Sequence, residues 1–322
     1  MKLVIQVPCY NEASTLGAVL SSLPREVAGF DAVEWLVVDD GSTDRTVEVA
    51  RSNGADHVVL LPRNHGLARA FMAGVGASLS AGADVIVNTD GDNQYCADDI
   101  PLLVGPILAG KAEIVIGTRP IAEIASFSPL KKLLLKIGTF VVRLFSNTDI
   151  QDAPSGFRAM TREAAMRLNI YNRYTYTLEM IIQAGQKDIA VTSVPIRVNP
   201  VSRPSRLIRS IPDYVLKSVV TIVRIFVVYK PFKSFITIGM ACLIPGFLVG
   251  LRYLYLLRLG EGAGHTQSLI LASVLLGVGF QTILSAFVAD LLAVNRRLLE
   301  DVQYRLQKSA PPPDPLPDQR KD

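Results

Sequence analysis

Two carboxylates and one amide stand close together in residues 84–94, whose letters are D-V-I-V-N-T-D-G-D-N-Q. Asp90 and Asp92 flank Gly91, and Gln94 follows two residues later. Side chains two apart in an extended backbone point to the same side, so both acids can face one oxygen-rich ligand. Hard cations bind carboxylate, amide and phosphate oxygens. The spacing therefore indicates a divalent cation that carries a diphosphate, although a solvated Asp/Gly turn has the same letters.

The element that must position these acids is the apolar run at residues 85–87, which is typical of a buried parallel strand. Similar runs alternate with helical patterns of about 10–15 residues, and this alternation predicts crossover connections and a parallel sheet. Open α/β sheets bind ligands at the C-terminal ends of their strands. We therefore expect an α/β nucleotide-binding domain with strands at residues 2–8, 33–38, 57–61, 85–87 and 113–117, and helices that begin near residues 14, 43, 66 and 98.

Two other expected strands also end in polar loops. The letters P-C-Y-N-E at residues 8–12 follow the first strand, and D-D-G-S-T-D at residues 39–44 follows the second. Together with D-G-D-N-Q, and in this order, these loops resemble the family 2 glycosyltransferases of the GT-A fold. Neither G-x-G-x-x-G nor a P-loop occurs in the sequence, so a dinucleotide fingerprint does not explain the loops.

Two later segments narrow the resemblance. The letters G-T-R at residues 117–119 and D-A-P-S-G-F-R at residues 152–158 are similar to segments of the dolichyl-phosphate mannose synthase branch. The resemblance covers about residues 1–207, and bacterial members of that branch often add two C-terminal membrane spans. It implies a metal-dependent, inverting transfer of one sugar from a UDP- or GDP-sugar to a polyisoprenyl phosphate, either undecaprenyl or dolichyl phosphate. The base and the sugar stay open, because these domains accept both uridine and guanosine donors.

The same resemblance implies a role for each matching residue. Asp92 and Gln94 would hold Mg²⁺ or Mn²⁺, and Asp90 with Gly91 would lie by the ribose or the diphosphate. Arg119 would contact a phosphate of the donor or the acceptor. The residues that would line the base and the ribose are Pro8, Tyr10, Glu12 and Asp40.

An acceptor that is already an anionic phosphate needs positive charge rather than a strong general base. Arg119, Arg158 and Arg203 are the candidates to supply that charge. A hydroxyl acceptor would instead need a carboxylate to take its proton, and Asp152 is the candidate. With a phosphate acceptor, Asp152 would orient Arg158 or the acceptor, and an Arg158 paired with Asp152 could also be purely structural.

Residues 197–209 depart from the family pattern. Relatives commonly carry R-x-x-G-x-S-K here, whereas this chain has R-V-N-P-V-S-R-P-S-R-L-I-R, without the glycine. Arg203 and Arg206 are both candidates for the phosphate contact, since a guanidinium suits bidentate phosphate binding. The alternative is a juxtamembrane basic patch that binds lipid headgroups.

The composition points to membrane spans, because only 19% of the residues are charged and the mean hydropathy is +0.32. Residues 234–251 and 266–289 contain no charged residue, and each stretch is near the roughly 20 residues that cross a bilayer. Two buried helices of a soluble core are the alternative. Basic residues lie before the first stretch and after the second, so the positive-inside rule places both ends of the chain in the cytoplasm.

We therefore expect a protein of the inner (plasma) membrane with two spans and four parts. The catalytic domain covers residues 1–208, an interfacial helix residues 209–231, the two spans residues 232–294, and a cytoplasmic tail with a disordered, Pro-rich end residues 295–322. Glycines at positions 239, 246, 250, 277 and 279 would permit close helix packing, so we also expect that the chain can form a homo-oligomer.

A second amphipathic stretch lies at residues 129–146, where leucine, isoleucine, valine and phenylalanine recur at helical spacing with lysine and arginine between them. This pattern predicts either an interfacial helix that lies on a membrane or an ordinary helix that covers the sheet. The chain has a net charge of +4, and its basic residues cluster beside the expected spans. This distribution fits contact with anionic lipid headgroups better than contact with nucleic acid.

Several other functions are disfavoured by the sequence. Processive polysaccharide synthases typically carry Q-x-x-R-W, but the only tryptophan here is Trp35, on the second expected strand. A nucleotidyltransferase would need a Gly-rich start that this chain lacks. Two alternatives stay open: a hydroxyl-directed transferase that acts on a lipid-linked saccharide, and a non-catalytic membrane partner, against which the intact Asp90, Asp92, Gln94 and Arg119 argue.

Overall fold

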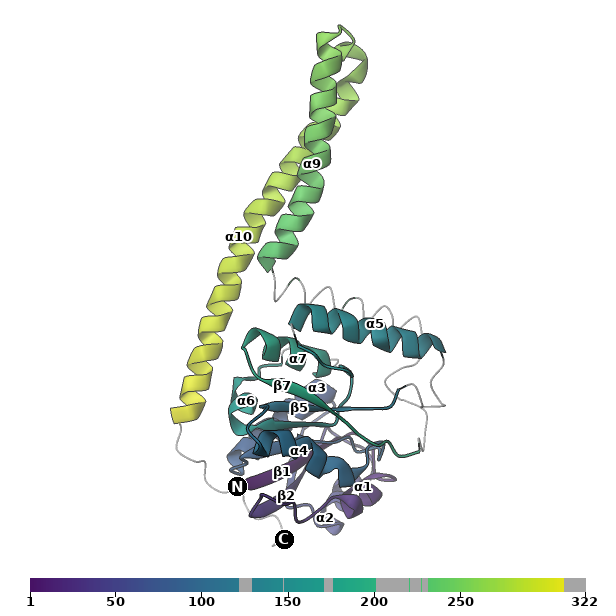
Figure 1. Ribbon diagram of the computed structural model, residues 1–322, viewed down its shortest axis with the longest axis vertical. Coiled ribbons are helices and arrows are strands. Elements are labelled where there is room, and N and C mark those ends of the chain that lie inside the picture. The colour runs from purple at the N-terminus through teal and green to yellow at the C-terminus, as the bar shows by residue number, and fades with distance from the viewer. Residues whose placement is uncertain are drawn as a thin grey trace. The chain divides into compact units, whose positions relative to one another are not determined.

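A computed structural model of the chain describes residues 1–121, 129–146, 148–170, 176–200 and 231–309, together with the single residues 220 and 227. The chain divides into two compact units, one made of Met1–Leu216 with Gln303–Asp322 and the other of Lys217–Val302 (Figure 1). The expected boundary after residue 208 and the interfacial helix at residues 209–231 fall almost entirely outside the described residues. The four-part organisation therefore stays a prediction.

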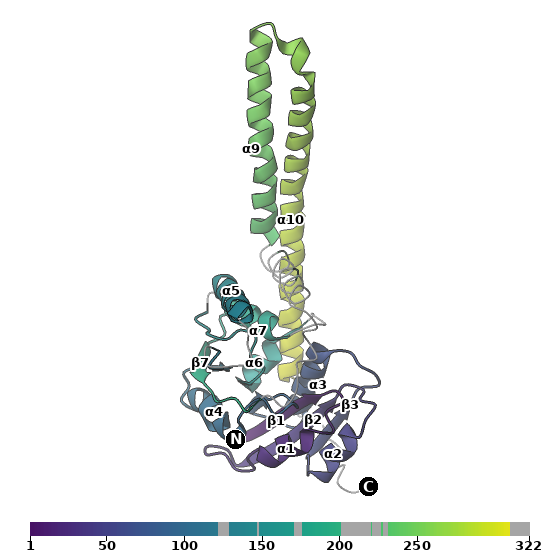
Figure 2. The same ribbon diagram turned by 90° about the vertical axis from the view of Figure 1, so that its right-hand side faces the viewer.

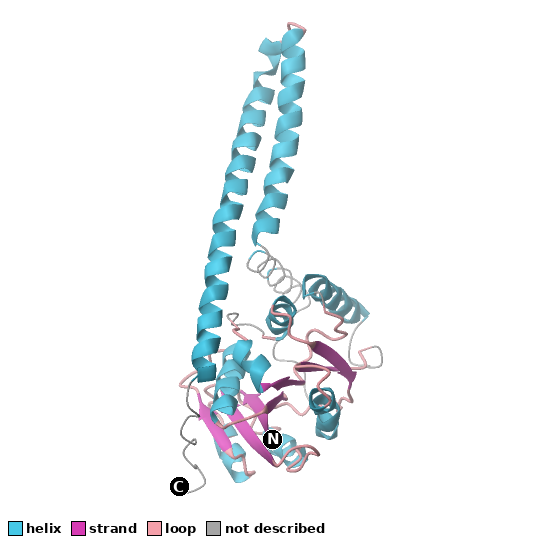
Figure 3. Ribbon diagram, turned by 60° about the vertical axis from the view of Figure 1, so that its left-hand side comes forward, coloured by secondary structure: helices cyan, strands magenta, loops and turns pink. Residues whose placement is uncertain are grey.

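The first unit is built on a mixed sheet. Within the described residues, seven strands pair in the order β3-β2-β1-β4-β6-β5-β7, and β6 alone runs antiparallel to its neighbours β4 and β5. Figure 3 draws the strands of the sheet in magenta. The strands are β1 (Lys2–Cys9), β2 (Ala32–Asp39), β3 (His57–Leu60), β4 (Val85–Asn88), β5 (Ile114–Thr118), β6 (Arg158–Thr161) and β7 (Val191–Pro195). The mostly parallel α/β sheet expected from the sequence is confirmed.

Two strands extend the sheet beyond the sequence expectation. β6 inserts between β4 and β5, so the fifth expected strand does not pair with the strand that precedes the acids. β7 adds a parallel partner to β5 at the sheet edge. The insertion of β6 brings residues 152–158, which lead into it, to the same edge of the sheet as the acid loop.

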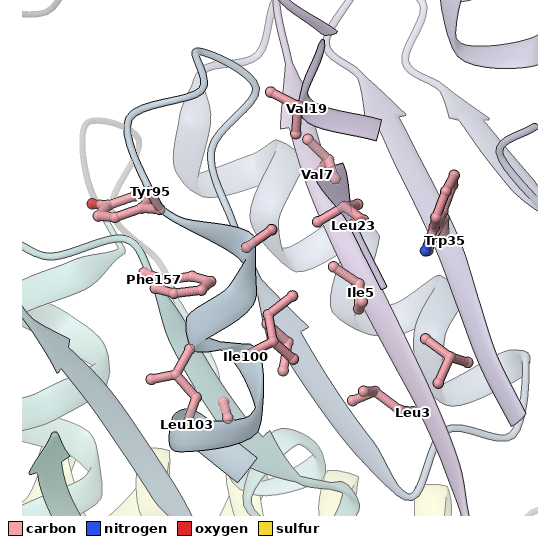
Figure 4. Packing of buried hydrophobic residues seen from close by; sticks show 14 of the residues in the cluster. Leu3, Ile5, Val7, Val19, Leu23, Trp35, Tyr95, Ile100, Leu103 and Phe157 are labelled. Carbon is pink, nitrogen blue, oxygen red and sulfur yellow. The ribbon is translucent and has the colours of Figure 1, made fainter. Parts of the chain in front are cut away.

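The helices cover both faces of the sheet (Figure 2). They are α1 (Leu16–Ser22), α2 (Thr46–Ser52), α3 (Leu67–Ser80), η1 (Ala97–Asp99), α4 (Ile100–Leu108), α5 (Pro129–Ser146), α6 (Arg162–Arg167) and α7 (Thr177–Gln186). α1, α2 and α4 bury their apolar side chains with alternate residues of β1 and β2, such as Ile5 and Trp35 (Figure 4). Alternation of this kind is the period-two pattern of strands packed on helices.

The opposite face of the sheet is covered by α3, which approaches very closely. A Cβ built on Gly74 of α3 would lie 2.6 Å from Gln6 Oε1 of β1 and 3.0 Å from Val38 Cγ2 of β2. α6 begins at an N-cap, because Thr161 Oγ1 accepts a hydrogen bond from the N–H of Ala164 at 3.1 Å. This cap ends β6 and fixes where the following helix starts.

α5 has one side packed on the domain and one side exposed, and the predicted contact of residues 129–146 with a membrane stays a prediction. Leu135, Thr139 and Val142 are buried on the side where the helix packs against α7. The other side exposes large apolar side chains at helical spacing, each between 50% and 64% exposed, which are Leu133, Ile137, Phe140 and Leu144. The helix therefore covers part of the domain and leaves one apolar stripe uncovered.

The second unit is a helical hairpin. Among the described residues, two helices are long and apolar enough to cross a membrane, α9 (Pro231–Arg258) and α10 (Thr266–Ser309). Only 17% of the most apolar window of each helix is buried. This exposure differs from that of a core helix, so the alternative of two buried soluble helices is not supported. α10 continues helically beyond residue 294 to Ser309, and the Pro-rich end that follows lies outside the described residues.

Small residues bring the two helices of the hairpin together. A Cβ on Gly239 would lie 2.6 Å from Ile283 Cγ1, and one on Gly279 would lie 2.9 Å from the carbonyl oxygen of Gly239. Gly246 is similarly close to Leu275, at 2.9 Å. These three glycines therefore serve packing within the chain rather than packing between copies.

Candidate active site

Three loops meet at the C-terminal ends of the parallel strands, as the sequence predicts. The hydroxyl of Thr15 lies 2.9 Å from Glu12 Oε2 and 2.9 Å from the carbonyl oxygen of Gly91, which joins the first loop to the acid loop. The N–H of Asn11 donates to Ser42 Oγ at 2.8 Å, which joins the first loop to the second. Pro8, Tyr10 and Glu12 therefore share one edge with the acids, although only Tyr10 of these three is well exposed, at 40%.

Gly91 is required by the close contact between these loops. A Cβ at this position would lie 2.8 Å from Cys9 Sγ and 3.4 Å from Glu12 Cγ. Any side chain would force the first loop and the acid loop apart. The glycine between the two acids therefore serves loop packing, and its expected contact with the nucleotide stays a prediction.

Asp90 lies against the segment that leads into β6. A Cβ on Gly156, from the segment that leads into β6, would lie 2.8 and 2.9 Å from the two carboxylate oxygens of Asp90. Burial, and secondly the charge of Asp92, raises the pKa of Asp90 to about 7. A bound cation would stabilise the ionised form of Asp90 beside the charge of Asp92.

Asp92 and Gln94 lie on either side of a strained residue. Asn93 has φ 59°, in the left-handed region, which asparagine adopts more readily than most residues other than glycine. The N–H of Gln94 donates to Asp92 Oδ1 at 3.2 Å, so the turn fixes the carboxylate of Asp92. Among the described side chains, no three His, Cys, Asp or Glu residues are grouped so that they could hold a metal alone. The donor set of two carboxylates and an amide fits a hard cation that completes its coordination with ligand oxygens.

Arg119 and Asp152 form a buried ion pair beside the acids. Arg119 Nε and Nη2 donate to the two oxygens of Asp152 at 2.7 and 2.9 Å, and the backbone N–H of Arg119 also points to this carboxylate at 3.2 Å. Asp152 is completely buried, and the side chain of Arg119 is 13% exposed. Burial by itself lowers the pKa of Arg119, but Tyr95, Asp152 and Asp90 together hold it above its ordinary value. Arg119 is therefore a fixed cation next to Asp90.

The position of Arg158 corrects the expectation that it contacts a phosphate. Its side chain is completely buried, and its guanidinium donates to the carbonyl oxygens of Ser155, Thr177 and Ala153 at 2.7, 2.8 and 2.6 Å. The structure also gives Asp152 a different partner, since Asp152 binds Arg119. Arg158 therefore holds the segment before β6 in place and has no exposed atom for a ligand.

Asp40 is likewise held by the backbone. Its two oxygens accept the N–H groups of His65 and Gly66, both at 2.8 Å, and the residue is 3% exposed. The carboxylate thus ties the second loop to the start of α3, and its contact with a base or ribose stays a prediction. The neighbouring Asp39 belongs to the same predicted loop, but no role of its own was predicted for it from the sequence. Its Oδ1 is buried and accepts no hydrogen bond within the part of the chain that the structure describes.

A hydroxyl and two aromatic rings support the segment opposite the acids, and these residues were also missed. The N–H of Gly156 donates to the hydroxyl oxygen of Tyr95 at 2.9 Å, and the Tyr95 ring stacks on Phe157 with centroids 5.1 Å apart. Asn88 Nδ2 lies 2.9 Å from the carbonyl oxygen of Gly156. No motif in the sequence marks these contacts, because they join segments that are 61 and 68 residues apart. Arg203 and Arg206, the remaining phosphate candidates, lie outside the described residues.

The fold is similar to that of known sugar transferases. The model of the family described as "Glycosyl transferase family 2" matches residues 4–168. The fold also matches glucosyl-3-phosphoglycerate synthase from Mycobacterium tuberculosis, in its crystal structure with Mn²⁺, UDP and glucosyl-3-phosphoglycerate. That match has a TM-score of 0.53 and 22% identity, and it covers 70% of this chain and 78% of that chain.

Two curated relatives act on polyprenyl phosphates by name. The undecaprenyl-phosphate mannosyltransferase of Micrococcus luteus is 26% identical over 61% of this chain and 83% of its own length. The UDP-N-acetylglucosamine–dolichyl-phosphate N-acetylglucosaminyltransferase of Methanococcus voltae is 28% identical over 59% of this chain and 83% of its own length. Since the family model spans more than half of the 322 residues, the chain belongs to glycosyl transferase family 2 and is a glycosyltransferase.

Proposed function

We propose that this glycosyltransferase transfers a single sugar, with inversion, from a UDP- or GDP-sugar to a polyisoprenyl phosphate, either undecaprenyl or dolichyl phosphate. The observation that carries the proposal is the buried Arg119–Asp152 pair beside the acid loop. This arrangement places one fixed positive charge next to a cluster of carboxylates. Two phosphates can meet at such a site, one bound through a cation and one bound by the guanidinium.

The donor would be held through a divalent cation, Mg²⁺ or Mn²⁺. Asp92 and Gln94 would bind this cation, and Asp90 would lie by the ribose or diphosphate. When bound, the cation would act as a Lewis acid that stabilises the charge of the leaving nucleoside diphosphate. Oδ1 of Asp39 accepts no hydrogen bond from the described residues and would accept one from the base or the ribose.

The position of Asp152 supports an anionic acceptor. A hydroxyl acceptor needs a carboxylate to take its proton, and Asp152 was the candidate. Its two oxygens already accept hydrogen bonds from Arg119, and the residue is completely buried. Asp152 is thus suited to orient Arg119 rather than to remove a proton. A phosphate oxygen of the lipid is already anionic and needs no such base.

The acceptor lipid would be presented at a membrane that the hairpin of α9 and α10 spans. We propose the inner (plasma) membrane, with the catalytic domain and both termini in the cytoplasm, because the basic residues lie outside the two apolar stretches. The exposed stripe of α5, formed by Leu133, Ile137, Phe140 and Leu144, would insert into the headgroup region. A homo-oligomer would have to use small residues that the hairpin leaves open, such as Gly277, around which a Cβ would meet nothing within 4 Å.

The experiment is a transfer assay on purified protein in detergent. Undecaprenyl or dolichyl phosphate and Mn²⁺ are supplied with a panel of radiolabelled UDP- and GDP-sugars, and the label in the organic phase is counted. The proposal predicts a product that mild acid hydrolyses, since the sugar is linked to the lipid through one phosphate. An acid-stable product formed only on a lipid-linked saccharide would identify the hydroxyl-directed alternative. A protein that binds nucleotide but forms no product would be a non-catalytic partner.

A further inference from the structure

We propose that Asn199 is a positioning residue of the active site, which holds Asn93 in its left-handed conformation and so keeps Asp92 and Gln94 aligned for the cation. The proposal rests on the metal role proposed above. Asn199 lies 106 positions after Asn93 in the chain, in a segment that follows β7 and precedes Arg203 and Arg206. The geometry that carries it lies entirely within the described residues.

The acid loop needs an external support because of its backbone. Asn93 has φ 59°, a conformation that costs energy for residues with a Cβ but that asparagine adopts when its side chain and backbone are held by hydrogen bonds. The loop ends in the isolated bridge at Tyr95, so neither a helix nor a strand holds the residues from Asp92 to Gln94. Such strain persists only where the surrounding structure imposes it.

Asn199 provides this support with its side chain and its backbone. Its Nδ2 lies 3.1 Å from the carbonyl oxygen of Asn93, 3.3 Å from Asn93 Oδ1 and 3.1 Å from the carbonyl oxygen of Tyr95. Its backbone N–H donates to the carbonyl oxygen of Gln94 at 2.9 Å. One residue therefore contacts the carbonyl oxygens of three successive residues of the loop.

The segment that carries Asn199 is itself fixed at several points. Arg197 forms hydrogen bonds to the buried Asp99 through its backbone N–H, Nε and Nη2, at 2.6, 2.9 and 2.6 Å. Val198 pairs with Tyr95 in an antiparallel bridge. The N–H of Ile196 donates to the carbonyl oxygen of Thr118, next to Arg119, at 3.0 Å. Asn199 is thus anchored to the end of β5 and to the start of α4, and it can resist relaxation of the loop.

The consequence for the site follows from the hydrogen bond between Gln94 and Asp92. The N–H of Gln94 points to Asp92 Oδ1 in the conformation in which Asn93 has φ 59°. If Asn93 relaxed to a negative φ, the peptide before Gln94 would rotate and this contact would be lost. The two expected cation ligands would then point in different directions.

The test measures Mn²⁺ binding directly, by the electron paramagnetic resonance signal of free Mn²⁺ in the presence of UDP or GDP, on the full chain in detergent. Asn199→Ala should weaken Mn²⁺ binding about tenfold while the thermal unfolding temperature stays close to native. Glycine adopts positive φ without strain, so adding Asn93→Gly to Asn199→Ala should restore most of the affinity. Asn53→Ala, which removes an exposed asparagine at the end of α2, is the matched control and should bind Mn²⁺ as the native chain does.

A second pair of variants keeps the test independent of whether Asn199→Ala folds. Asn93→Gly alone should bind Mn²⁺ at least as tightly as the native chain, because glycine adopts positive φ without strain. Asn93→Ala should bind it more weakly, because alanine is more strained at positive φ than asparagine. Native affinity in Asn199→Ala, or a loss that Asn93→Gly does not restore, would overturn the inference. If the native chain itself bound no Mn²⁺ with either nucleotide, the metal proposal would fail, and this inference would fail with it.

Discussion

Asp152 holds Arg119 by both oxygens, with Arg119 Nε at 2.7 Å and Nη2 at 2.9 Å, in a pair whose acid is completely buried. This two-point contact fixes the plane of the guanidinium, and no hydrogen bond within the described residues takes the two N–H groups of Nη1, which can donate to another anion. Asp90 and Asp92 lie nearby, so a phosphate bound by Arg119 would lie next to one bound through a cation. Under the proposed function, the pair would link the acceptor side of the site to the donor side.

We predict that Asp152→Asn lowers kcat/KM for the lipid acceptor by about 100-fold or more, because Arg119 loses its orientation. The change also leaves a buried cation unpaired, at a cost of up to about 3–5 kcal/mol in the free energy of unfolding. Thermal unfolding should be measured beside transfer kinetics. The control is Asp149→Asn, which breaks the exposed ion pair between Arg143 and Asp149. Its transfer rates should stay within about twofold of native. Near-native acceptor kinetics in a folded Asp152→Asn protein would show that Arg119 does not act through Asp152.

A second prediction concerns pH. The pKa of Asp90 is raised to about 7 by burial and then by Asp92, whereas in the unfolded chain it lies near 3.8. Between these values the folded chain binds more protons than the unfolded chain, so the contribution of Asp90 to stability is lost as pH rises from about 4 through about 7. Asp90→Asn should remove this part of the pH dependence and raise the unfolding temperature of the metal-free protein most at pH values above about 7.

The ionisation of Asp90 should also affect how strongly the cation binds. Since a cation favours ionised Asp90, Mn²⁺ with UDP or GDP should raise the unfolding temperature more at about pH 8 than at about pH 6. Thermal unfolding of native and Asp90→Asn protein, with and without Mn²⁺, measures both effects. Parallel curves for the two proteins across this range would contradict the raised pKa.

A third prediction concerns the glycine that faces Asp90. Gly156→Ala places a Cβ 2.8 Å from one oxygen of Asp90, in a buried segment that Tyr95 and Asn88 also hold. We expect a lower unfolding temperature and weaker Mn²⁺ binding, because Asp90 must move. The control is Gly76→Ala on α3, where a Cβ would meet nothing within 4 Å. Removing that helical glycine should leave transfer unchanged and stabilise the fold by about 0.5–1 kcal/mol. Equal behaviour of the two variants would contradict the close packing at Asp90.

A fourth prediction tests the proposed membrane contact of α5. The only tryptophan, Trp35, is 6% exposed, so one added tryptophan can report its own surroundings against a low background. In protein reconstituted into vesicles with brominated lipids, Phe140→Trp fluorescence should be quenched strongly. Leu102→Trp on α4 replaces a residue that is 51% exposed and should be quenched little. Equal quenching at both positions would show that the exposed stripe of α5 is not in the membrane.

The sequence predicted the elements whose pattern is local. The apolar runs before the three polar loops form β1, β2 and β4, and the amphipathic residues 129–146 form α5 with the predicted bounds. β6 was missed because its four residues, R-A-M-T, carry no apolar run, and it forms only by pairing between β4 and β5. Local pattern therefore predicted which loops would meet but not the antiparallel insertion in the sheet.

The roles of individual side chains were also not predictable from local sequence pattern alone. Asp40 and Arg158 stand in motifs where a ligand contact and a structural contact use the same letters, and only tertiary burial shows that their groups are bound to backbone atoms. The partner of Arg119 could not be read from spacing, because Asp152 lies 33 residues away. The support of Asn93 by Asn199 spans 106 residues and has no local signal at all.

The most direct test of the central claim is the lipid-product assay applied to Asp92→Ala and Asp98→Ala. The two acids are close in sequence, but Asp92 belongs to the proposed cation site, whereas the side chain of Asp98 is 80% exposed. With Mn²⁺, a polyisoprenyl phosphate and the donor that the native chain uses, Asp98→Ala should form the acid-labile lipid product at a near-native rate. Asp92→Ala, folded and inserted in the membrane, should form essentially none. Substantial product from Asp92→Ala, or none from the native chain with any donor, would contradict a cation-assisted transfer to the lipid phosphate.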